Sequence, residues 1–267
     1  EKTFFAMFSQ EWQRQRGAQP LRQIAIIDDE PNNQYLCPEF QLFQQLFQSF
    51  GMQAVVIDAR ELRWHDGKLW ANERPIDLVY NRLTDFYLED SAHQALKMAY
   101  EANAVVLTPH PQAHALYANK HNLVRLSNAQ SLTQLGINEA LQQTLLNTIP
   151  KTETVNPAKA DDLWARRKQL FFKPANGYGS KATYRGDKMT RRVWEEILQG
   201  DYVAQQLVPP SARRLQADGV EAELKVDIRA YAYAGEIQLL AARLYTGQTT
   251  NFRTSGGGFA PVFLMPN

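Results

Sequence analysis

Lysine and glycine residues are concentrated in the stretch FFKPANGYGSK, residues 171–181. An apolar segment ends at Lys173, and a turn containing Gly177 and Gly179 follows it. Because glycine has no Cβ, backbone N–H groups in such a turn can approach anionic oxygens closely, and a lysine adds a point charge. This pattern favours phosphate binding. A hairpin with surface lysines is the alternative interpretation, since glycine favours turns in general.

Three familiar nucleotide-binding motifs are absent from the sequence. It contains no GxxxxGK[ST] loop, and residues 171–188 lack the third glycine of a protein-kinase loop. No GxGxxG follows the first expected strand, so the dinucleotide fingerprint is also missing. Phosphate binding would therefore use another arrangement.

A second set of charged residues lies in the segment KVDIRAYAYAGEIQLLAARL. Lys225, Asp227 and Arg229 alternate along one expected strand, so their side chains share a face, and Arg243 lies on the next strand. Burying these charges is costly unless a charged ligand sits among them, and a triphosphate with its metal would satisfy them. Asp227 is the candidate metal ligand, with an ion pair to Arg229 as the structural alternative. The polar loop that follows contributes Asn251, Arg253, Gly256, Gly257 and Gly258.

A third candidate site is the pair Asn81 and Arg82, which ends the apolar segment IDLVYNR. In open α/β sheets, ligands bind in the crevice at the carboxyl ends of the strands. We therefore favour a substrate contact for this pair over a structural ion pair between Arg82 and Asp85.

The first half of the chain has the elements that would position such a crevice. Apolar runs predict strands at RQIAIIDDEP, MQAVVIDA, IDLVYNR and AVVLTP, with helices at TFFAMFSQEWQRQRG, PEFQLFQQLFQSFG and EDSAHQALKMAYEAN. Asp66-Gly67 predicts a hairpin. Alternating strands and helices indicate an α/β sheet of Rossmann-like type.

The second half of the chain reads as helices followed by strands. The pattern is helical from His110 to Leu146 with a break at Gly136, and residues 149–162 look like a linker or an extended crossing. Residues 190–200 form an expected helix, YVAQQLVPP an expected strand ended by prolines, and residues 224–247 two long strands joined at Ala234-Gly235.

In this order, the segments resemble the ATP-grasp superfamily over the whole chain. DIRAYAYAGEIQLLAARL followed by TTNFRTSGGG is similar to the glutathione synthetase segment that carries D-x-R, A-R, an asparagine and a glycine-rich loop. The order of the parts, with VYNR and ALYANKHNLVRLS, looks more like the circularly permuted branch that includes glutathionylspermidine synthase. The resemblance implies a leading helix in 1–20, a Rossmann-like domain in 21–118, a helical connection in 119–162, a lid in 163–208 and a nucleotide-binding part of α+β type in 209–267.

The resemblance also implies roles for single residues. Lys173 matches the lid lysine that holds the α- and β-phosphates, and Lys120 matches a lysine that enters the site ahead of the lid. Arg229, Arg243 and Asn251 match catalytic positions near the γ-phosphate, and Asp227 and Asn251 match the Mg²⁺ side. Other implied ATP contacts are Gly177, Gly179, Ser180, Lys181, Lys225 and the hinge residues Gln205, Gln206, Leu207 and Val208; implied substrate contacts are Asn81, Arg82, Arg253, Gly256, Gly257 and Gly258.

The chain departs from the family pattern at the metal site. Non-permuted members end with an acidic metal segment, usually a Glu-x-Asn pair, after the glycine loop, whereas this sequence ends at Asn267. In permuted members that segment lies upstream, and because the sequence does not begin with Met, we expect Glu1 to mark a fragment, a processed chain or a trimmed chain. Glu30-Pro31-Asn32 is a weaker candidate, since acids and asparagine are also ordinary turn residues.

Composition sets limits on partners. A net charge of +1 gives no global attraction to nucleic acid or anionic membranes, and no apolar run approaches the roughly 20 residues of a membrane span. The single cysteine, Cys37, excludes an internal disulfide and fits a cytoplasmic protein. His110 and His114 are spaced like zinc ligands on a helix, but no third ligand is evident and a structural role is favoured.

The function implied by the resemblance is that of an ATP- and Mg²⁺-dependent ligase that joins a small-molecule or peptide carboxylate to an amine through an acylphosphate. Such chemistry depends on positioning and charge neutralisation, which agrees with the lack of an obvious nucleophile. A kinase-like phosphotransferase on the same fold and a nucleotide-binding module without turnover are the alternatives, since fold does not determine function.

Overall fold

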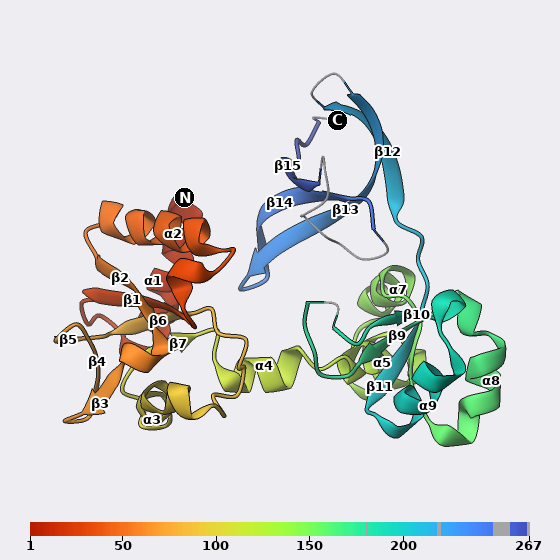
Figure 1. Cartoon of the computed structure of the whole chain (residues 1–267), viewed down its shortest axis with the longest axis horizontal. Coiled ribbons are helices and arrows are strands. Elements are labelled where there is room, and N and C mark those ends of the chain that lie inside the picture. Colours follow the sequence, from red (N-terminus) through yellow and green to blue (C-terminus); the bar gives the residue numbers. More distant parts are fainter. Residues whose placement is uncertain (180, 218–219, 248–256, 266–267) are drawn as a thin grey trace. The chain divides into compact units, whose positions relative to one another are not determined.

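The computed structural model describes residues 1–179, 181–217, 220–247 and 257–265. In it, the segment QIAIID forms a fully buried strand, β1 (Gln23–Asp28). It lies inside a four-stranded sheet of order β2-β1-β6-β7, with β2 (Gln53–Asp58), β6 (Leu78–Asn81) and β7 (Val106–Thr108) all parallel (Figure 1). Parallel strands covered on both faces read as continuous apolar runs, which explains why these segments were predicted correctly.

Helices cover both faces of this sheet. Phe8 and Trp12 of α1 (Lys2–Arg16) and Phe40 and Phe47 of α2 (Cys37–Ser49) are buried in one cluster with Ile24 of β1. The opposite face packs on α3 (Gln94–Glu101) and on a small antiparallel sheet, β3 (Arg63–His65), β4 (Lys68–Ala71) and β5 (Arg74–Pro75).

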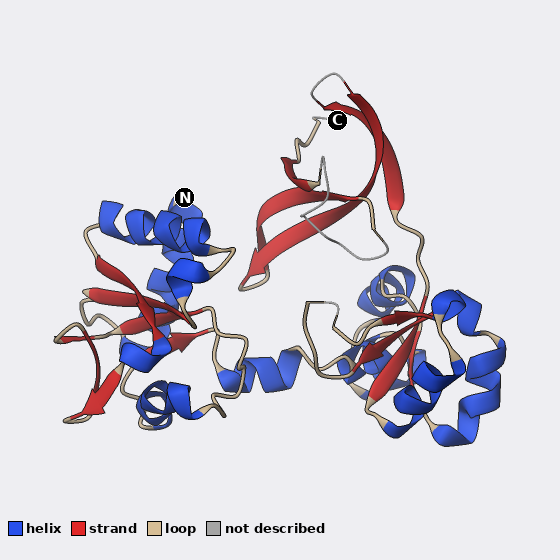
Figure 2. Cartoon of the chain, viewed as in Figure 1, coloured by secondary structure: helices blue, strands red, loops and turns tan. Residues whose placement is uncertain are grey.

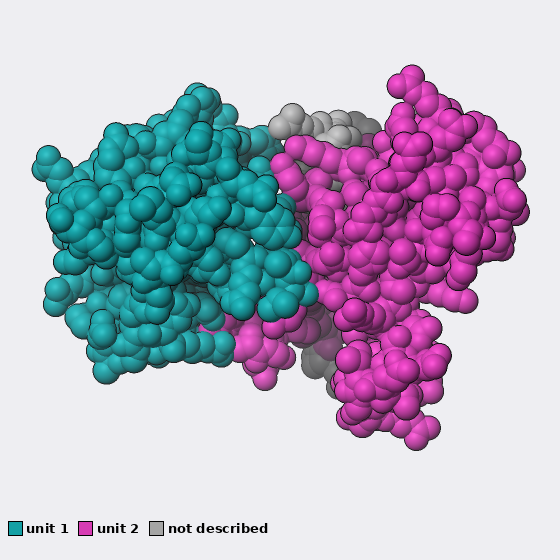
Figure 3. All heavy atoms as spheres, turned by 90° about the horizontal axis from the view of Figure 1, so that it is seen from below, with its two compact units in different colours: residues 1–116 teal, residues 117–267 magenta. Residues whose placement is uncertain are grey.

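The hairpin predicted between β3 and β4 is confirmed. Asp66 and Gly67 have φ angles of 51° and 68°, the paired left-handed conformation of a two-residue turn. These elements belong to the first of two units of the chain, residues 1–116 and 117–267, which we call unit 1 and unit 2 (Figure 3).

Short helices follow β7 in the sequence, as the pattern predicts. They are α4 (Pro111–Tyr117), α5 (His121–Leu126), α6 (Ala129–Gln134) and α7 (Glu139–Thr148). The side chains of Asn128 and Asn138 cap α6 and α7 by accepting backbone N–H hydrogen bonds, and Gly136 separates the two helices with a φ of 70°.

Unit 2 contains an antiparallel sheet of order β10-β9-β11-β8. Figure 2 draws the strands of the chain in red and the helices in blue. Its strands are β8 (Thr152–Thr154), β9 (Leu170–Pro174), β10 (Tyr184–Arg185) and β11 (Tyr202–Gln206). Phe172 and Ala204 pack one face on α8 (Ala160–Ala165) and α9 (Arg191–Gln199) through Leu163 and Trp194. Of the two interpretations of residues 149–162, the extended crossing agrees with β8, whereas a plain linker does not account for β8 or for the start of α8.

A second antiparallel sheet of unit 2 has the order β12-β13-β14-β15. Its strands are β12 (Ser211–Ala217), β13 (Val220–Tyr233), β14 (Glu236–Tyr245) and β15 (Gly258–Pro261). The turn between β13 and β14 lies at Ala234 and Gly235, both with positive φ, as predicted. Strand β12 was not predicted. The remaining short 3₁₀ turns are Pro31–Asn33, Ala59–Glu61, Ser91–His93, Pro157–Lys159, Arg167–Gln169 and Gly186–Lys188.

The predicted mixed α/β class, with parallel and antiparallel sheets, is confirmed. None of the helices in the described residues combines the length and hydrophobicity that a bilayer span requires.

Candidate anion-binding site

Lys173 lies on β9, on the sheet face opposite the α8–α9 core. Residues alternate between the two faces of a strand, so the burial of Phe172 in the core places Lys173 on the other face. Its Nζ donates a hydrogen bond of 2.7 Å to Oε1 of Gln205. Gln205 is buried on the neighbouring strand β11, and its Nε2 donates a hydrogen bond of 2.9 Å to Oγ1 of Thr152 on β8. Three strands therefore fix the position of the Lys173 side chain.

Lys120 is held beside the same strand by its backbone and its side chain. Its N–H donates to the carbonyl of Ala175 at 2.9 Å, and its Nζ donates to the carbonyl of Gly177 at 3.1 Å. The next residue, His121, contacts a carboxylate oxygen of Asp201 through Nε2 at 2.7 Å. The start of α5 is thus tied to the chain on both sides of the glycine-containing loop.

The two lysines form an uncompensated positive site. Burial, and then the positive charge of Lys120, lowers the pKa of Lys173, and burial lowers the pKa of Lys120. Within the described part of the chain, no carboxylate pairs with either ammonium group. Both lysines are only partly buried, and an anion bound between them would still offset the cost of removing their charges from water.

The loop after β9 has the backbone freedom predicted from its glycines. Gly177 and Gly179 have φ angles of 158° and 59°, and a Cβ on Gly177 would lie 3.0 Å from Cγ of Pro174. The Nζ of Lys181 donates to the hydroxyl of Tyr178 at 3.1 Å and lies over its ring. Ser180, the other predicted phosphate contact of this loop, lies outside the described residues.

The predicted hinge, Gln205 to Val208, consists of the last two residues of β11 and the two residues after it. The N–H of Gln206 donates to the carbonyl of Lys151, and that of Leu207 donates to the carbonyl of Gln169, each at 2.8 Å. Val208 is exposed and lines a pocket of about 430 Å³ with Gln206 and Lys151. Two of the backbone donors expected to meet a ligand are therefore used inside the chain, which leaves Val208 and the carbonyl groups.

On the second sheet of unit 2, Asp227 pairs with Arg243 of the neighbouring strand. Its Oδ1 accepts a hydrogen bond from Nε of Arg243, which lies directly opposite on β14. Asp227 thus forms a salt bridge with Arg243 on the neighbouring strand. Arg229 lies over the ring of Tyr231, 5.0 Å from its centroid, because residues two apart share a face.

The other predicted residues of this sheet fall into two groups. The Nζ of Lys225 donates to the carbonyl of Gly247 at 2.6 Å, and Gly257 and Gly258 lead into β15. Asn251, Arg253 and Gly256 lie outside the described residues. The face that carries Lys225, Asp227 and Arg229 is therefore present as predicted, while the loop expected to complete it is not described.

In unit 1, Asn81 and Arg82 lie at the carboxyl end of β6. Nδ2 of Asn81 donates to the carbonyl of Pro109 at 3.3 Å, and its Oδ1 accepts from the N–H of Leu83 at 3.1 Å. Arg82 forms its salt bridge with Glu39 of α2, at 3.1 Å. The alternative pairing of Arg82 with Asp85 is wrong, because Asp85 contacts a histidine.

That histidine, His93, was not predicted as a site residue. It is 2% exposed, and its Nδ1 and Nε2 lie 2.7 Å and 2.9 Å from carboxylate oxygens of Asp85 and Asp29. Burial disfavours its charge, but the hydrogen bonds to both carboxylates outweigh burial and raise the pKa of His93. His93 therefore links the loops that follow β1 and β6, the two strands at the point where the sheet order reverses.

The described residues do not assemble a metal site. No group of three or more His, Cys, Asp or Glu side chains is placed to hold an ion in the described ranges. Glu30, the weaker metal candidate, pairs with Arg60 at 3.3 Å. His114 stacks on Phe86 with a centroid distance of 3.8 Å, and Nδ1 of His110 accepts the N–H of Ala113.

Comparisons with known proteins place the fold. No protein-family model and no curated protein sequence matches this chain. Among solved structures, a glutathione synthetase-like effector (GSS30) from Globodera pallida matches with a TM-score of 0.54 and 10% identity, covering 91% of this chain and 58% of that one. This chain therefore spans less than two thirds of that protein.

Two further solved structures have TM-scores below 0.5. The ATP-grasp ligase PsnB, complexed with a phosphomimetic variant of its minimal precursor, Mg and ADP, has a TM-score of 0.47 at 14% identity, covering 85% of this chain and 75% of that one. D-cycloserine synthetase DcsG has a TM-score of 0.44 at 16% identity, covering 76% and 67%. The likeness to the glutathione synthetase-like effector shows a shared fold and does not by itself show a function.

Proposed function

We propose that this chain binds ATP through Lys120 and Lys173 and acts as an ATP-dependent ligase that joins a carboxylate to an amine. One observation carries the proposal: two lysines with lowered pKa values meet beside a glycine-containing loop, and no described carboxylate neutralises them. An ATP-grasp type of fold agrees with this assignment but does not by itself determine the reaction.

Each part of the site has a role in this proposal. Lys173, fixed by Gln205, holds the α- and β-phosphates, and Lys120 holds phosphate oxygens from the side of α5. The loop with Gly177 and Gly179 covers the phosphates with backbone N–H groups. Residues 163–208 form the lid over residues 209–267, the helical connection is 119–162, and 21–118 is the Rossmann-like domain, preceded by the helix in 1–20. Lys181 and Ser180 add further phosphate contacts, and Gln206, Leu207 and Val208 lie along the adenine.

Other predicted residues would serve the reacting groups. Arg229, Arg243 and Asn251 neutralise charge near the γ-phosphate, and Lys225 supports them. Arg253 and the glycines at 256–258 face the acceptor carboxylate. Asn81 and Arg82 contact the second substrate at the carboxyl edge of the parallel sheet. The substrates are small-molecule or peptide carboxylates and amines, and the reaction takes place in the cytoplasm.

Mg²⁺ remains a prediction from the resemblance. Asp227, the described candidate ligand, is used by Arg243, and Asn251 lies outside the described residues. Because these donors do not make a site, we assign no step to a metal. The phosphate charge would be met in this chain by the lysines and arginines named above.

The proposed chemistry has two displacements. A carboxylate oxygen attacks the γ-phosphorus of ATP, the bond to the bridging oxygen breaks, and ADP leaves. An amine then attacks the acyl carbon of the resulting acylphosphate, loses a proton, and expels inorganic phosphate. The contribution of the protein is orientation of the reactants and exclusion of water by the closed lid.

Trapping the acylphosphate with hydroxylamine tests the reaction. The full chain is given ATP, Mg²⁺, hydroxylamine and a panel of amino acids, N-acyl amino acids and short peptides, and hydroxamate, ADP and phosphate are measured. We expect equal amounts of the three products with one class of carboxylate. Lys173→Met should abolish them, and Lys168→Met, which removes an exposed lysine near the start of the same strand, should not.

The other outcomes separate the alternatives. A stable phosphorylated product without hydroxamate would identify a phosphotransferase. ATP binding without turnover of any carboxylate would identify a nucleotide-binding module. A chain that neither binds nor consumes ATP would contradict the proposal itself.

A further inference from the structure

A pocket of about 480 Å³ lies at the edge of the parallel sheet opposite the carboxyl ends of its strands. Gln23 and Gln53, which line it, are the first residues of β1 and β2 and lie opposite each other in register. A six-residue strand is about 17 Å long at a rise of roughly 3.3 Å per residue. The pocket is therefore separate from the crevice in which Asn81 and Arg82 lie, and it belongs entirely to unit 1.

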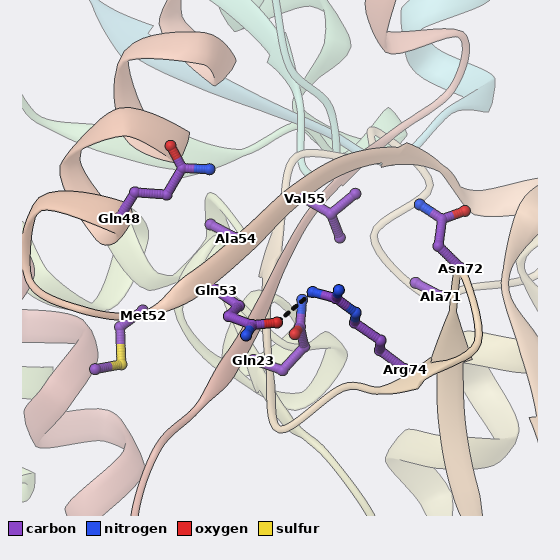
Figure 4. A pocket seen from close by; sticks show the side chains of 9 residues that line it. All are labelled: Gln23, Gln48, Met52, Gln53, Ala54, Val55, Ala71, Asn72 and Arg74. Carbon is purple, nitrogen blue, oxygen red and sulfur yellow. Dashed lines mark hydrogen bonds between the residues drawn. The ribbon is translucent and has the colours of Figure 1, made fainter.

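The polar lining of this pocket is rich in carboxamides and carries one charge. Its charged group is the guanidinium of Arg74 on β5, which donates a hydrogen bond to Oε1 of Gln53 (Figure 4). The floor is apolar and comes from β2 and β4. Within the described part of the chain, Arg74 forms no salt bridge, so its charge is available to an anion. The polar lining consists of Gln23, Gln48, Gln53, Asn72 and Arg74.

Gln23 is the most informative of these side chains. The residue is 8% exposed, and its backbone N–H donates to a carboxylate oxygen of Asp77 at 2.8 Å. Its side-chain amide forms no hydrogen bond to any described residue, and Figure 4 shows it reaching toward the guanidinium of Arg74. The amide faces the open space of the pocket, where a ligand can accept a hydrogen bond from it and donate one to it.

The turn at the rim of the pocket is strained. Asn72 and Glu73 form the two-residue connection between β4 and β5 and have φ angles of 47° and 63°. Asparagine tolerates this conformation, but the second position usually requires glycine, and glutamate is disfavoured there. The strained turn brings Asn72 and Arg74 to the same pocket, and strain of this kind concentrates at ligand-binding sites.

We propose that this pocket binds a small carboxylate that also contains an amide, such as an N-acyl amino acid. The planar guanidinium of Arg74 matches a carboxylate in two-point contact. The carboxamides of Gln23 and Asn72 donate to and accept from the amide of the ligand, while the apolar floor meets its carbon chain. The volume suits a ligand of this size. This site does not depend on the function proposed for Lys120 and Lys173.

Nuclear magnetic resonance of the ¹⁵N-labelled full chain tests the proposal with a matched pair of probes. N-acetylglutamine carries the carboxylate, and N-acetylglutaminamide replaces it with a carboxamide. We expect saturable shifts of the Gln23 and Asn72 side-chain amide signals with N-acetylglutamine and at least tenfold weaker binding of the amide. Arg74→Gln should weaken N-acetylglutamine binding at least tenfold, whereas Lys68→Gln, which removes an exposed charge from β4, should leave it unchanged.

The backbone signals that a substitution leaves unchanged show that the variant is folded. Arg74 is exposed, so its variant should keep the backbone signals of unit 1, and Gln23→Leu provides a second variant that removes the buried amide. Equal affinity for the two probes, equal affinity in Arg74→Gln, or no saturable shift in the wild-type chain would overturn the proposal. A shift pattern around Lys173 in place of Gln23 would also overturn it.

Discussion

Lys173→Met gives the most informative perturbation of the proposed ATP site. The ammonium group makes one hydrogen bond inside the chain, to Gln205, and is otherwise free to contact an anion. A hydrogen bond to a charged group contributes about 1.5–3 kcal/mol, so its loss should weaken ATP binding about 10- to 150-fold.

Thermal unfolding in the presence of ATP measures this loss. At an ATP concentration 100 times the wild-type dissociation constant, the ligand stabilises the wild-type chain by about 2.7 kcal/mol. The same ATP concentration should stabilise Lys173→Met by only about 0.3–1.4 kcal/mol. The control Lys168→Met should keep the full stabilisation. If Lys173→Met kept it as well, the assignment of Lys173 to the phosphates would be wrong.

The pH dependence of the ligand-free chain gives a second readout of the same variant. Burial and the charge of Lys120 lower the pKa of Lys173 below its ordinary value of 10.5, so the folded state releases this proton more readily than the unfolded state. Stability therefore rises as pH increases from the lowered pKa toward 10.5. Without Lys173, this part of the rise should disappear. A structural lysine in a salt bridge would give the opposite slope.

Three other substitutions have defined outcomes. Gly186→Ala places a Cβ 1.9 Å from the carbonyl oxygen of Arg167, and denaturant titration should show a loss of about 2–4 kcal/mol. His93→Gln should lower the free energy of unfolding by about 3 kcal/mol at pH 5.5. Because the pKa of His93 is raised in the folded state, the stability that its charged form contributes is complete below pH 6.5 and is lost as pH rises through the folded pKa. The loss caused by the substitution should therefore be smaller at pH 9. A pH-independent cost would contradict the charged His93 pair. Asp201→Asn should weaken ATP binding about 2- to 5-fold in a fluorescence titration. The substitution removes the ion pair with His121, the neighbour of Lys120, and such an exposed pair contributes about 0.5–1 kcal/mol. An unchanged affinity for ATP would exclude this positioning role of Asp201.

Local signals account for the elements that were predicted correctly. The strands of the parallel sheet are apolar runs because both of their faces are covered, and the helix α2 ends next to Gly51. The hairpins at Asp66-Gly67 and Ala234-Gly235 follow from residues that adopt positive φ. In each case the information lies within a few residues of the element itself.

Strand β15 was missed because its segment was predicted to belong to a polar, glycine-rich loop. Strands β8 and β12 were missed because their pairing is long-range or their pattern is weak. Strand β8 has only three residues, and its partner β11 lies about fifty positions later in the sequence. Strand β12 begins with serine, alanine and two arginines, which show no apolar alternation, and it pairs only with β13 on the edge of its sheet. The dipeptide Asp218-Gly219 that follows β12 in the sequence was the available signal for this hairpin.

In the candidate site too, contacts between residues that are distant in sequence could not be predicted from the sequence. Lys173 and its loop are adjacent in sequence, so their association was predictable, whereas Thr152 and Gln205 meet Lys173 only through strand pairing. The ion pairs considered as alternatives for Asp227 and Arg82 were with the nearest opposite charges in sequence. The actual partners come from a neighbouring strand and from α2, because cross-strand and helix contacts bring distant residues closer than residues two or three apart.

Calorimetric titration of ATP into the full chain, with the double variant Lys120→Met, Lys173→Met beside it, tests the central claim most directly. The account predicts saturable binding of one ATP per wild-type chain and no measurable heat with the double variant, while both proteins keep the same far-ultraviolet circular dichroism. Equal binding by the two proteins would contradict the assignment of the lysines to the phosphates. The absence of ATP binding by the wild-type chain, with and without Mg²⁺, would contradict the proposed function as a whole.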